Sequence, residues 1–146
     1  MKLRCAQNFD PAVFVGDSWT QAEEDERANQ LAEIDVSAIA LVGCLEKDQE
    51  QPIGEQCLKL LKQTSYIRLG GRAFIALWEH QQLIPERWKD PFTFVFFDGL
   101  ILRHQNGNRY SLYISWEGAR WQWYSCWLGN TRNAKNPSAV LHSPSH

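Results

Sequence analysis

The sequence predicts an α+β domain in which N-terminal helices pack on one face of a C-terminal four-stranded antiparallel meander. The C-terminal half carries three X-Gly pairs between apolar or alternating runs, at Asp98-Gly99, Asn106-Gly107 and Glu117-Gly118, and such pairs are typical of hairpin turns. Two amphipathic segments and one capped acidic segment precede them. A chain of 146 residues has the size of a single domain with one core.

The chain is expected to begin with a lead-in over residues 1–16, followed by a mainly helical segment over 17–90. In the lead-in, Asp10 can cap a short turn that has Pro11 at its first position. Ser18 and Thr20 each begin a capping-box pattern and therefore predict a helix in the acidic run that follows, over 22–28.

The middle of the chain combines one expected strand with two expected helices. A period-two apolar row over 34–45 predicts a strand, and a polar loop follows over 46–51. Apolar residues at helical spacing predict a helix over 54–63. A second helix is expected after Gly70-Gly71; it should end before Pro85, with a further turn over 86–89.

The meander is expected over residues 91–128, with strands at about 92–97, 100–105, 108–116 and 119–127, and a polar tail over 129–146. In the tail, only Ala139-Val140-Leu141 offers an apolar segment to dock. Three two-residue turns would place Phe96 opposite Ile101, Ile101 opposite Leu112, and Leu112 opposite Trp123.

This register assigns each side chain of the meander to one of two faces. The core face would carry Phe94, Phe96, Ile101, Tyr110, Leu112, Ile114, Trp116, Trp121, Trp123 and Trp127. The second face would carry Val95, Phe97, Leu100 and Leu102 on its first two strands, then Arg109, Ser111, Tyr113, Ser115, Arg120, Gln122 and Tyr124. The last two strands of the second face therefore combine aromatic rings with arginines.

Composition argues against several classes of protein. A formal net charge of −2 provides no long-range basic field for nucleic acid or anionic membranes. No signal-peptide pattern and no window of about 20 apolar residues is present, so we expect a cytoplasmic protein that does not enter the membrane. The four cysteines lack Cys-x-x-Cys spacing and are expected to be reduced; no metal site and no cofactor is predicted.

Several short motifs resemble an uncharacterised family of small proteins from candidate-phylum (Parcubacteria-like) bacteria. The motifs are Phe9-Asp10-Pro11, Glu23 with Asp25-Glu26-Arg27, Leu77-Trp78, Ile84-Pro85-Glu86, Trp88-Lys89, Phe96-Phe97-Asp98-Gly99 and Pro137-Ser138-Ala139-Val140-Leu141. The resemblance would cover nearly the whole chain, and Gly70-Gly71 departs from it where a polar helix cap is expected. It implies a bacterial, intracellular protein and supplies no catalytic residue.

The candidate binding site is the second face, at Arg109, Tyr113, Arg120, Gln122 and Tyr124. Tyrosine offers a flat apolar ring with a polar tip, and arginine stacks on rings or binds carboxylate and phosphate. We therefore expect a non-enzymatic binding protein whose partner is an unidentified protein or a second copy of the chain. The alternatives are a single-stranded nucleic-acid binder that stacks bases on this face, and a face that is merely solvated or covered by a helix.

Three further residues are candidates for an interface: Trp88, next to Pro85, and the apolar pair Phe97 and Leu102 on the second face, through which a homodimer could form. A small enzyme whose residues converge only in three dimensions is the remaining alternative. No Gly-x-Ser-x-Gly, His-Glu-x-x-His or Walker-type motif supports it, and no catalytic residue is predicted.

Overall fold

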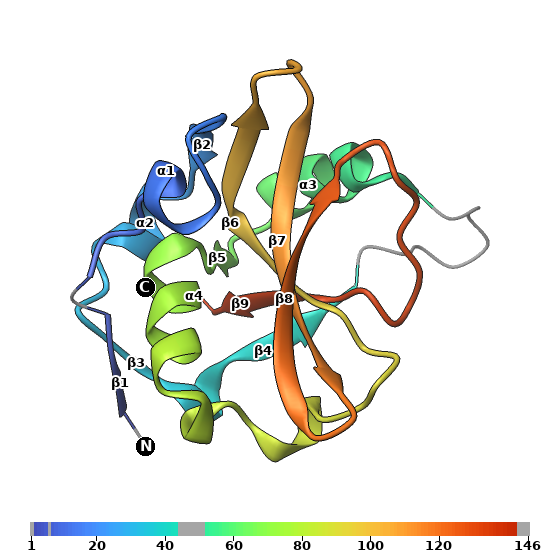
Figure 1. The fold of residues 1–146 in the computed structure, drawn as a ribbon. Coiled ribbons are helices and arrows are strands. Elements are labelled where there is room, and N and C mark those ends of the chain that lie inside the picture. Colours follow the sequence, from blue (N-terminus) through green and yellow to red (C-terminus); the bar gives the residue numbers. More distant parts are fainter. Residues whose placement is uncertain (1, 6, 44–51, 143–146) are drawn as a thin grey trace.

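The computed structural model describes residues 2–5, 7–43 and 52–142, and in these ranges helices and strands form a mixed α+β fold (Figure 1). Helices are α1 (Pro11–Phe14), α2 (Glu26–Asn29), α3 (Gly54–Lys62) and α4 (Gly71–Glu79), with 3-10 turns η1 (Val36–Ala38), η2 (Gln81–Leu83) and η3 (Glu86–Trp88). None of the helices within these ranges is long and apolar enough to cross a membrane.

The main sheet has seven strands and is organised around β6 (Val95–His104). Its order is β4 (Ala40–Val42), β9 (Ser138–Leu141), β6, β7 (Arg109–Glu117) and β8 (Arg120–Trp127). In addition, β2 (Trp19–Glu24) pairs with β6, and β5 (Ile67–Arg68) pairs with β9. A separate two-stranded sheet joins β1 (Lys2–Arg4) to β3 (Glu33–Asp35). Only the β6 and β9 contact in the main sheet is parallel.

The expected hairpin at Asp98-Gly99 is wrong, because this pair lies inside the continuous strand β6. The strands expected over 92–97 and 100–105 are thus one long strand, and the meander has three strands, β6, β7 and β8. The pairing of β6 with β7 shifts between Phe96 and Ile101, which marks an irregularity around the Asp98-Gly99 pair. An Asp-Gly pair indicates a turn where its backbone can face solvent. Asp98 and Gly99 are both buried, so they do not form one.

The two remaining hairpins form, but their registers differ from the expected ones. After β6 the backbone N–H of His104 donates to Asn108 O at 3.1 Å, so three residues make the turn, and Ile101 lies opposite Ser111 instead of Leu112. In the next hairpin the turn residues are Gly118 and Ala119, because Glu117 already pairs with Arg120.

The second hairpin therefore places Leu112 opposite Ser125 instead of Trp123. The pairing is thus shifted by two residues, an even number, so the side chains of β7 and β8 stay on the faces predicted for them.

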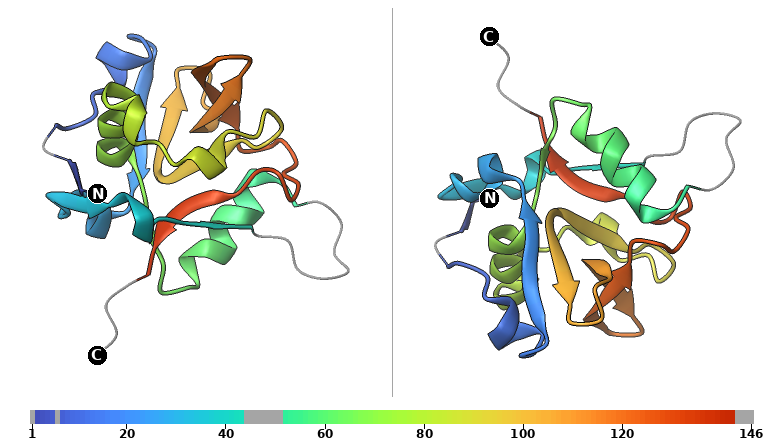
Figure 2. Two further views of the ribbon diagram at one scale, coloured as in Figure 1. Left: turned by 90° about the horizontal axis from the view of Figure 1, so that it is seen from below. Right: turned by 90° about the horizontal axis from the view of Figure 1, so that it is seen from above.

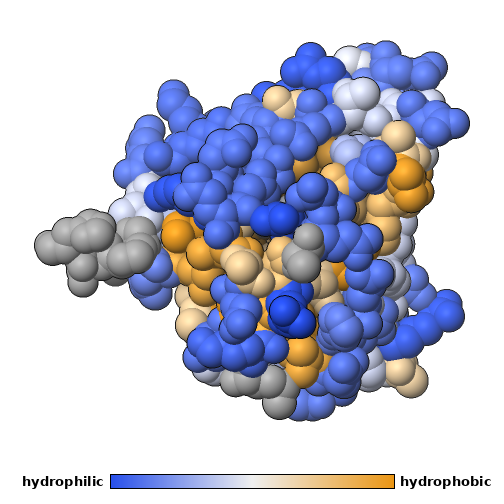
Figure 3. Space-filling view, turned by 90° about the vertical axis from the view of Figure 1, so that its left-hand side faces the viewer, coloured by the Kyte–Doolittle hydropathy of each residue, from blue (hydrophilic) through white to orange (hydrophobic). Residues whose placement is uncertain are grey.

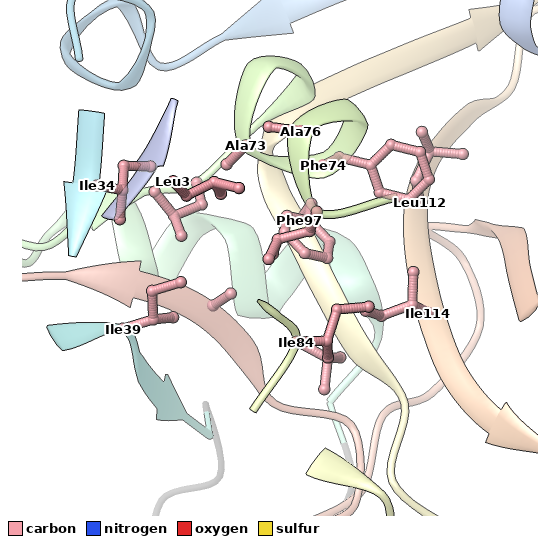
Figure 4. Close-up of a cluster of buried hydrophobic side chains, with 14 of the residues drawn as sticks. Leu3, Ile34, Ile39, Ala73, Phe74, Ala76, Ile84, Phe97, Leu112 and Ile114 are labelled. Atoms are coloured by element: carbon pink, nitrogen blue, oxygen red, sulfur yellow. The ribbon is translucent and has the colours of Figure 1, made fainter. Parts of the chain in front are cut away.

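The register between β6 and β7 differs by one residue from the expected one, and this difference exchanges the two faces of β6. Phe97, Leu100 and Leu102, expected on the second face, belong to the buried core. Figure 4 shows Phe97 in the middle of this core, and its ring packs edge-on against Phe74 of α4 at 5.4 Å. Ile101, expected in the main core, instead joins a small second cluster.

The two longer helices lie on opposite sides of β9 (Figure 2). α4 contributes Phe74 and Leu77 to the main core, whereas α3 contributes Leu58 to the second cluster with Ile101 and Leu128. Both helices occur where the sequence predicted them, and η3 supplies the further turn expected near Pro85.

The N-terminal segment forms strands where helices were expected. Asp10 does cap α1, since its carboxylate accepts from the N–H of Ala12 at 3.1 Å. Residues 19–24, however, form β2, because pairing with β6 outweighs their helix propensity, and α2 contains only Glu26–Asn29.

The segment expected to be one strand and the segment expected to be a tail also differ in structure from these expectations. The strand predicted over 34–45 is divided into β3, η1 and β4, and the loop predicted over 46–51 lies outside the described residues. Residues 17–90 thus contribute β2, β3, β4 and β5 besides helices. The segment Ala139-Val140-Leu141 belongs to β9, which pairs with β4, β5 and β6.

Gly99 provides a test of this architecture. A Cβ added at Gly99 would lie 2.7 Å from the carbonyl carbon of Leu69 and closer still to the carbonyl oxygen of Arg68. We expect Gly99→Ala to lower the free energy of unfolding in urea by about 1–3 kcal/mol, because backbone atoms cannot yield as a flexible side chain can. Gly43→Ala, where nothing lies within 4 Å, is the control, and equal stability of the two variants would contradict this packing.

Candidate functional site

The second face of the sheet is divided by α3. Arg109, at the start of β7, forms ion pairs with Glu23 of β2 at 2.9 Å and with Glu55 of α3 at 3.0 Å. Lys62 of α3 also pairs with Glu23. Burial would raise the pKa of the Glu23 carboxyl, but hydrogen bonds from Lys62 and Arg109 outweigh it and hold this pKa below its usual value. Arg109 is therefore engaged within the chain and does not belong to an open surface.

The part of the second face that α3 leaves open begins with a group of stacked rings. Tyr113 of β7 and Tyr124 of β8 lie directly opposite each other, with ring centroids 5.3 Å apart. Phe94 stacks on Tyr113 at 4.7 Å with an interplanar angle of 23°, and the buried ring of Phe96 lies 4.9 Å from Tyr113. The rings thus form a continuous row from buried Phe96 to exposed Tyr124.

Exposure increases along this row. Phe94 and Tyr113 are half-buried, while Tyr124 has 39% of its surface exposed. Burial, together with the nearby Cys126, Tyr124 and Glu117, raises the pKa of Tyr113 to about 12. The Tyr113 hydroxyl is therefore protonated at neutral pH and can donate a hydrogen bond.

A polar group continues the same face toward the β7–β8 turn. The Ser115 hydroxyl donates to Glu117 Oε2 at 2.8 Å. A hydrogen bond from the Tyr124 hydroxyl, and then the one from Ser115, lowers the pKa of Glu117. With its amide oriented to satisfy both groups, the Gln122 oxygen accepts from Arg120 Nη2 at 2.9 Å and Nε at 2.7 Å.

These side chains make one surface, which we call the Tyr124 face. Its members lie on β7, β8 and the segment before β6: Phe94, Tyr113, Glu117, Arg120, Gln122 and Tyr124, with the buried Ser115 bonded to Glu117. Rings held on two paired strands can stack on a flat or apolar group, while the carboxylate, amide and guanidinium at one end can form hydrogen bonds.

Four of the five predicted binding residues lie together on this face, and Arg109 does not. Sequence reasoning missed Phe94, because the two-residue turn expected at Asn106-Gly107 placed Ile101 opposite Leu112 and so assigned Phe94, on the same side as Ile101, to the core face. It also left out Glu117 as a turn residue, although its position opposite Arg120 follows from a turn made by Gly118 and Ala119.

The three predicted interface residues are buried within the chain. Trp88, Phe97 and Leu102 are exposed by at most 1%, so none of them can contact a partner in this structure. Phe97 and Leu102 face the core because the register of β6 with β7 differs by one residue from the expected one, and Trp88, the last residue of η3, packs in the same core.

Among the residues that the structure describes, the cysteines and histidines form no further site. Cys57 is disulfide-bonded, so the expectation of four reduced thiols is wrong; Cys5 and Cys126 are free, and Cys44 lies outside the described residues. His104 packs against the ring of Trp19 at 4.8 Å. Within the described ranges, no group of three or more histidine, cysteine or acidic residues could hold a metal ion.

Other apolar surface is present on the side that carries β1 and β3, where it lies between polar areas (Figure 3). Among the described residues, three large apolar side chains are more exposed than Tyr124, namely Val13 at 82%, Phe92 at 71% and Trp127 at 45%. The Tyr124 face combines its exposed ring with an adjoining hydrogen-bonding group. Comparison with protein-family models, curated proteins and solved structures finds no match for the chain.

A buried charge cluster lies behind the Phe96 end of the row. The carboxylate of Asp98 is fully buried and accepts two hydrogen bonds from Arg132, at 2.7 and 2.9 Å. Ser111 donates to it at 2.8 Å, and Ser138 donates as well. The Arg132 guanidinium also lies over the Phe96 ring, 3.9 Å from its centroid. The cluster connects β6, β7, β9 and the loop after β8.

The charge of Asp98 makes folding sensitive to acid. Burial alone would raise the pKa of this carboxyl, but the charge and hydrogen bonds of Arg132, with those of Ser138 and Ser111, lower it below the ordinary value. A lowered folded-state pKa contributes stability that is present above the unfolded value, near 4, and is lost as pH falls through the folded value.

We expect Asp98→Asn to lower the free energy of unfolding at pH 7 by about 3–5 kcal/mol, because Arg132 is left buried without its counter-charge. The variant should also lose less stability than the wild type as pH falls below about 4. Urea unfolding of both proteins between pH 7 and pH 2 measures this. Parallel pH profiles for the two would show that Asp98 is not held as a charged group.

Proposed function

We propose that this chain is a non-enzymatic binding protein whose contact surface is the Tyr124 face. The observation that carries the proposal is the row of stacked rings that ends in an exposed tyrosine beside hydrogen-bonding groups, on a part of the sheet that α3 leaves uncovered. Tyrosine and arginine are enriched at the energetic centres of protein interfaces.

The rigidity of the face supports binding. Tyr113 is fixed between Phe94, Phe96 and Tyr124, so little side-chain entropy remains to be lost when a partner covers these rings. Tyr124 is oriented at its other end by the hydrogen bond to Glu117. A surface that is ordered before it meets its partner binds at a lower entropic cost.

Tyr124→Ala tests the proposal by removing the exposed ring. Proteins captured by the immobilised wild type from a bacterial extract should be lost with Tyr124→Ala and retained with Val13→Ala, which removes a more exposed side chain from a different surface. We expect Tyr124→Ala to weaken binding of a captured protein about 30-fold or more, as at an interface hot spot. Equal capture by both variants would remove the Tyr124 face from the function.

Single-stranded nucleic acid is a second candidate for the same face, because stacked rings beside an arginine also suit unpaired bases. The charges argue against it: Arg109 and Arg132 are both paired with carboxylates, and Glu117 places a negative charge on the face.

We therefore expect that a mixed-sequence single-stranded oligonucleotide leaves the tryptophan fluorescence of the protein unchanged at both low and moderate salt. Saturable quenching that weakens with salt and is lost in Arg120→Ala would instead support the nucleic-acid function.

A further inference from the structure

The outer edge of β8 has no pairing partner in the part of the chain that the structure describes. β8 pairs with β7 over eight consecutive residues, from Arg120 opposite Glu117 to Trp127 opposite Tyr110, without a shift in register. It lies at the end of the strand order, after β7, and Figure 1 shows it at the front of the molecule.

The backbone groups that face outward can be assigned from one hydrogen bond. The N–H of Leu128 donates to Arg109 O at 2.9 Å, so Arg109 and Leu128 are a hydrogen-bonded pair. Because such pairs alternate along antiparallel strands, Gln122, Tyr124 and Cys126 also bond to β7. The N–H and C=O groups of the intervening residues therefore face away from β7; these residues are Trp121, Trp123, Ser125 and, at the end of the strand, Trp127. The C=O of Trp127 already accepts from the N–H of Asn130 at 3.0 Å.

Among the described residues, no backbone hydrogen bond outside the strand pairing reaches the outward groups of Trp121, Trp123 and Ser125. Proteins usually protect an edge strand of this length with proline, a bulge or a charge in its middle. β8 contains no proline, its pairing is regular, and its one charged residue, Arg120, is at its first position. The edge is thus open to the addition of another strand.

We propose that β8 pairs in antiparallel fashion with β8 of a second copy of this chain, about a two-fold axis at Trp123. The proposal rests on the proposed function, since it names a second copy as a partner of the surface formed by β7 and β8. Trp121 would pair with Ser125, Trp123 with its equivalent, and Ser125 with Trp121. This register pairs both backbone groups of all three residues. A shift by two residues would instead place Trp121 opposite Trp127, whose C=O already accepts from the N–H of Asn130.

Charge and side-chain chemistry also suit a second copy. In this register the two Arg120 side chains are six residues apart along the strand, or about 20 Å, so they do not repel each other closely. Arg120 would lie opposite Cys126 and diagonal to Tyr124 of the second copy, within reach of a cation–π contact with its exposed ring. Gln122 would lie opposite Tyr124, so the two Tyr124 faces would become one continuous surface.

Amide hydrogen exchange on the wild-type protein tests the register directly, with sedimentation to measure its mass. We expect a concentration-dependent dimer in which the amides of Trp121, Trp123 and Ser125 are protected and lose protection about 10-fold or more on dilution. The amides of Gln122, Tyr124 and Cys126 should stay protected throughout, because they bond to β7. A monomer at all concentrations, or a dimer whose outward amides remain unprotected, would overturn the proposal.

Ser125→Pro provides an independent test. Proline lacks the outward N–H of residue 125, and all hydrogen bonds between β8 and β7 are kept. We expect dimerisation to weaken 10-fold or more in Ser125→Pro and to be unchanged in the control Ser125→Ala, which keeps the N–H. Unchanged dimerisation of a folded Ser125→Pro would contradict the proposed edge. If Ser125→Pro does not fold, the exchange pattern of the wild type decides.

These outcomes separate the dimer from the proposed function. A monomeric wild type that still loses its captured proteins on Tyr124→Ala would retain the binding function and reject the dimer. A dimer with protected outward amides, in which Tyr124→Ala changes neither capture nor dimerisation, would retain the dimer and reject the Tyr124 face as a binding surface.

Discussion

The buried ion pair between Asp98 and Arg132 is the interaction on which the rest of the sheet depends. It joins the middle of β6 to the loop after β8, while Ser111 and Ser138 attach β7 and β9 to the same carboxylate. Arg68 of β5 adds a hydrogen bond from its guanidinium to the Asp98 carbonyl oxygen at 3.0 Å. A carboxylate without water must have its lone pairs occupied, and here each occupant comes from a different segment.

The position of this cluster also determines where the Tyr124 face lies. β6 is irregular around Asp98 and Gly99, and this irregularity turns Phe97 and Leu100 toward the core while Phe96 stays beside Arg132. Phe96 in turn supports Tyr113, which supports Tyr124. The exposed Tyr124 ring is therefore connected, through Tyr113 and Phe96, to the buried ion pair of Arg132 and Asp98.

The sequence allowed local features to be predicted better than features that depend on distant contacts. The helices over 54–63 and after Gly70-Gly71 follow from apolar periodicity, and the faces of β7 and β8 follow from alternation in one hairpin. The role of Asp98 could not be predicted, because its four hydrogen-bonding partners are at positions 68, 111, 132 and 138, in other elements of the chain. The same long-range pairing explains β2, whose acidic sequence favours a helix until β6 is present.

The pairing of β6 with β2 has a kinetic consequence. Trp19 lies opposite His104, so the chain must close a very long loop before this part of the sheet can form, and β9 joins β6 from the other direction. Closing such a loop lowers the conformational entropy of the chain before the stabilising contacts can form. Topologies of this kind therefore fold slowly. The β7–β8 hairpin is local and can form early, so its open edge would be exposed to other chains while the rest of the sheet assembles.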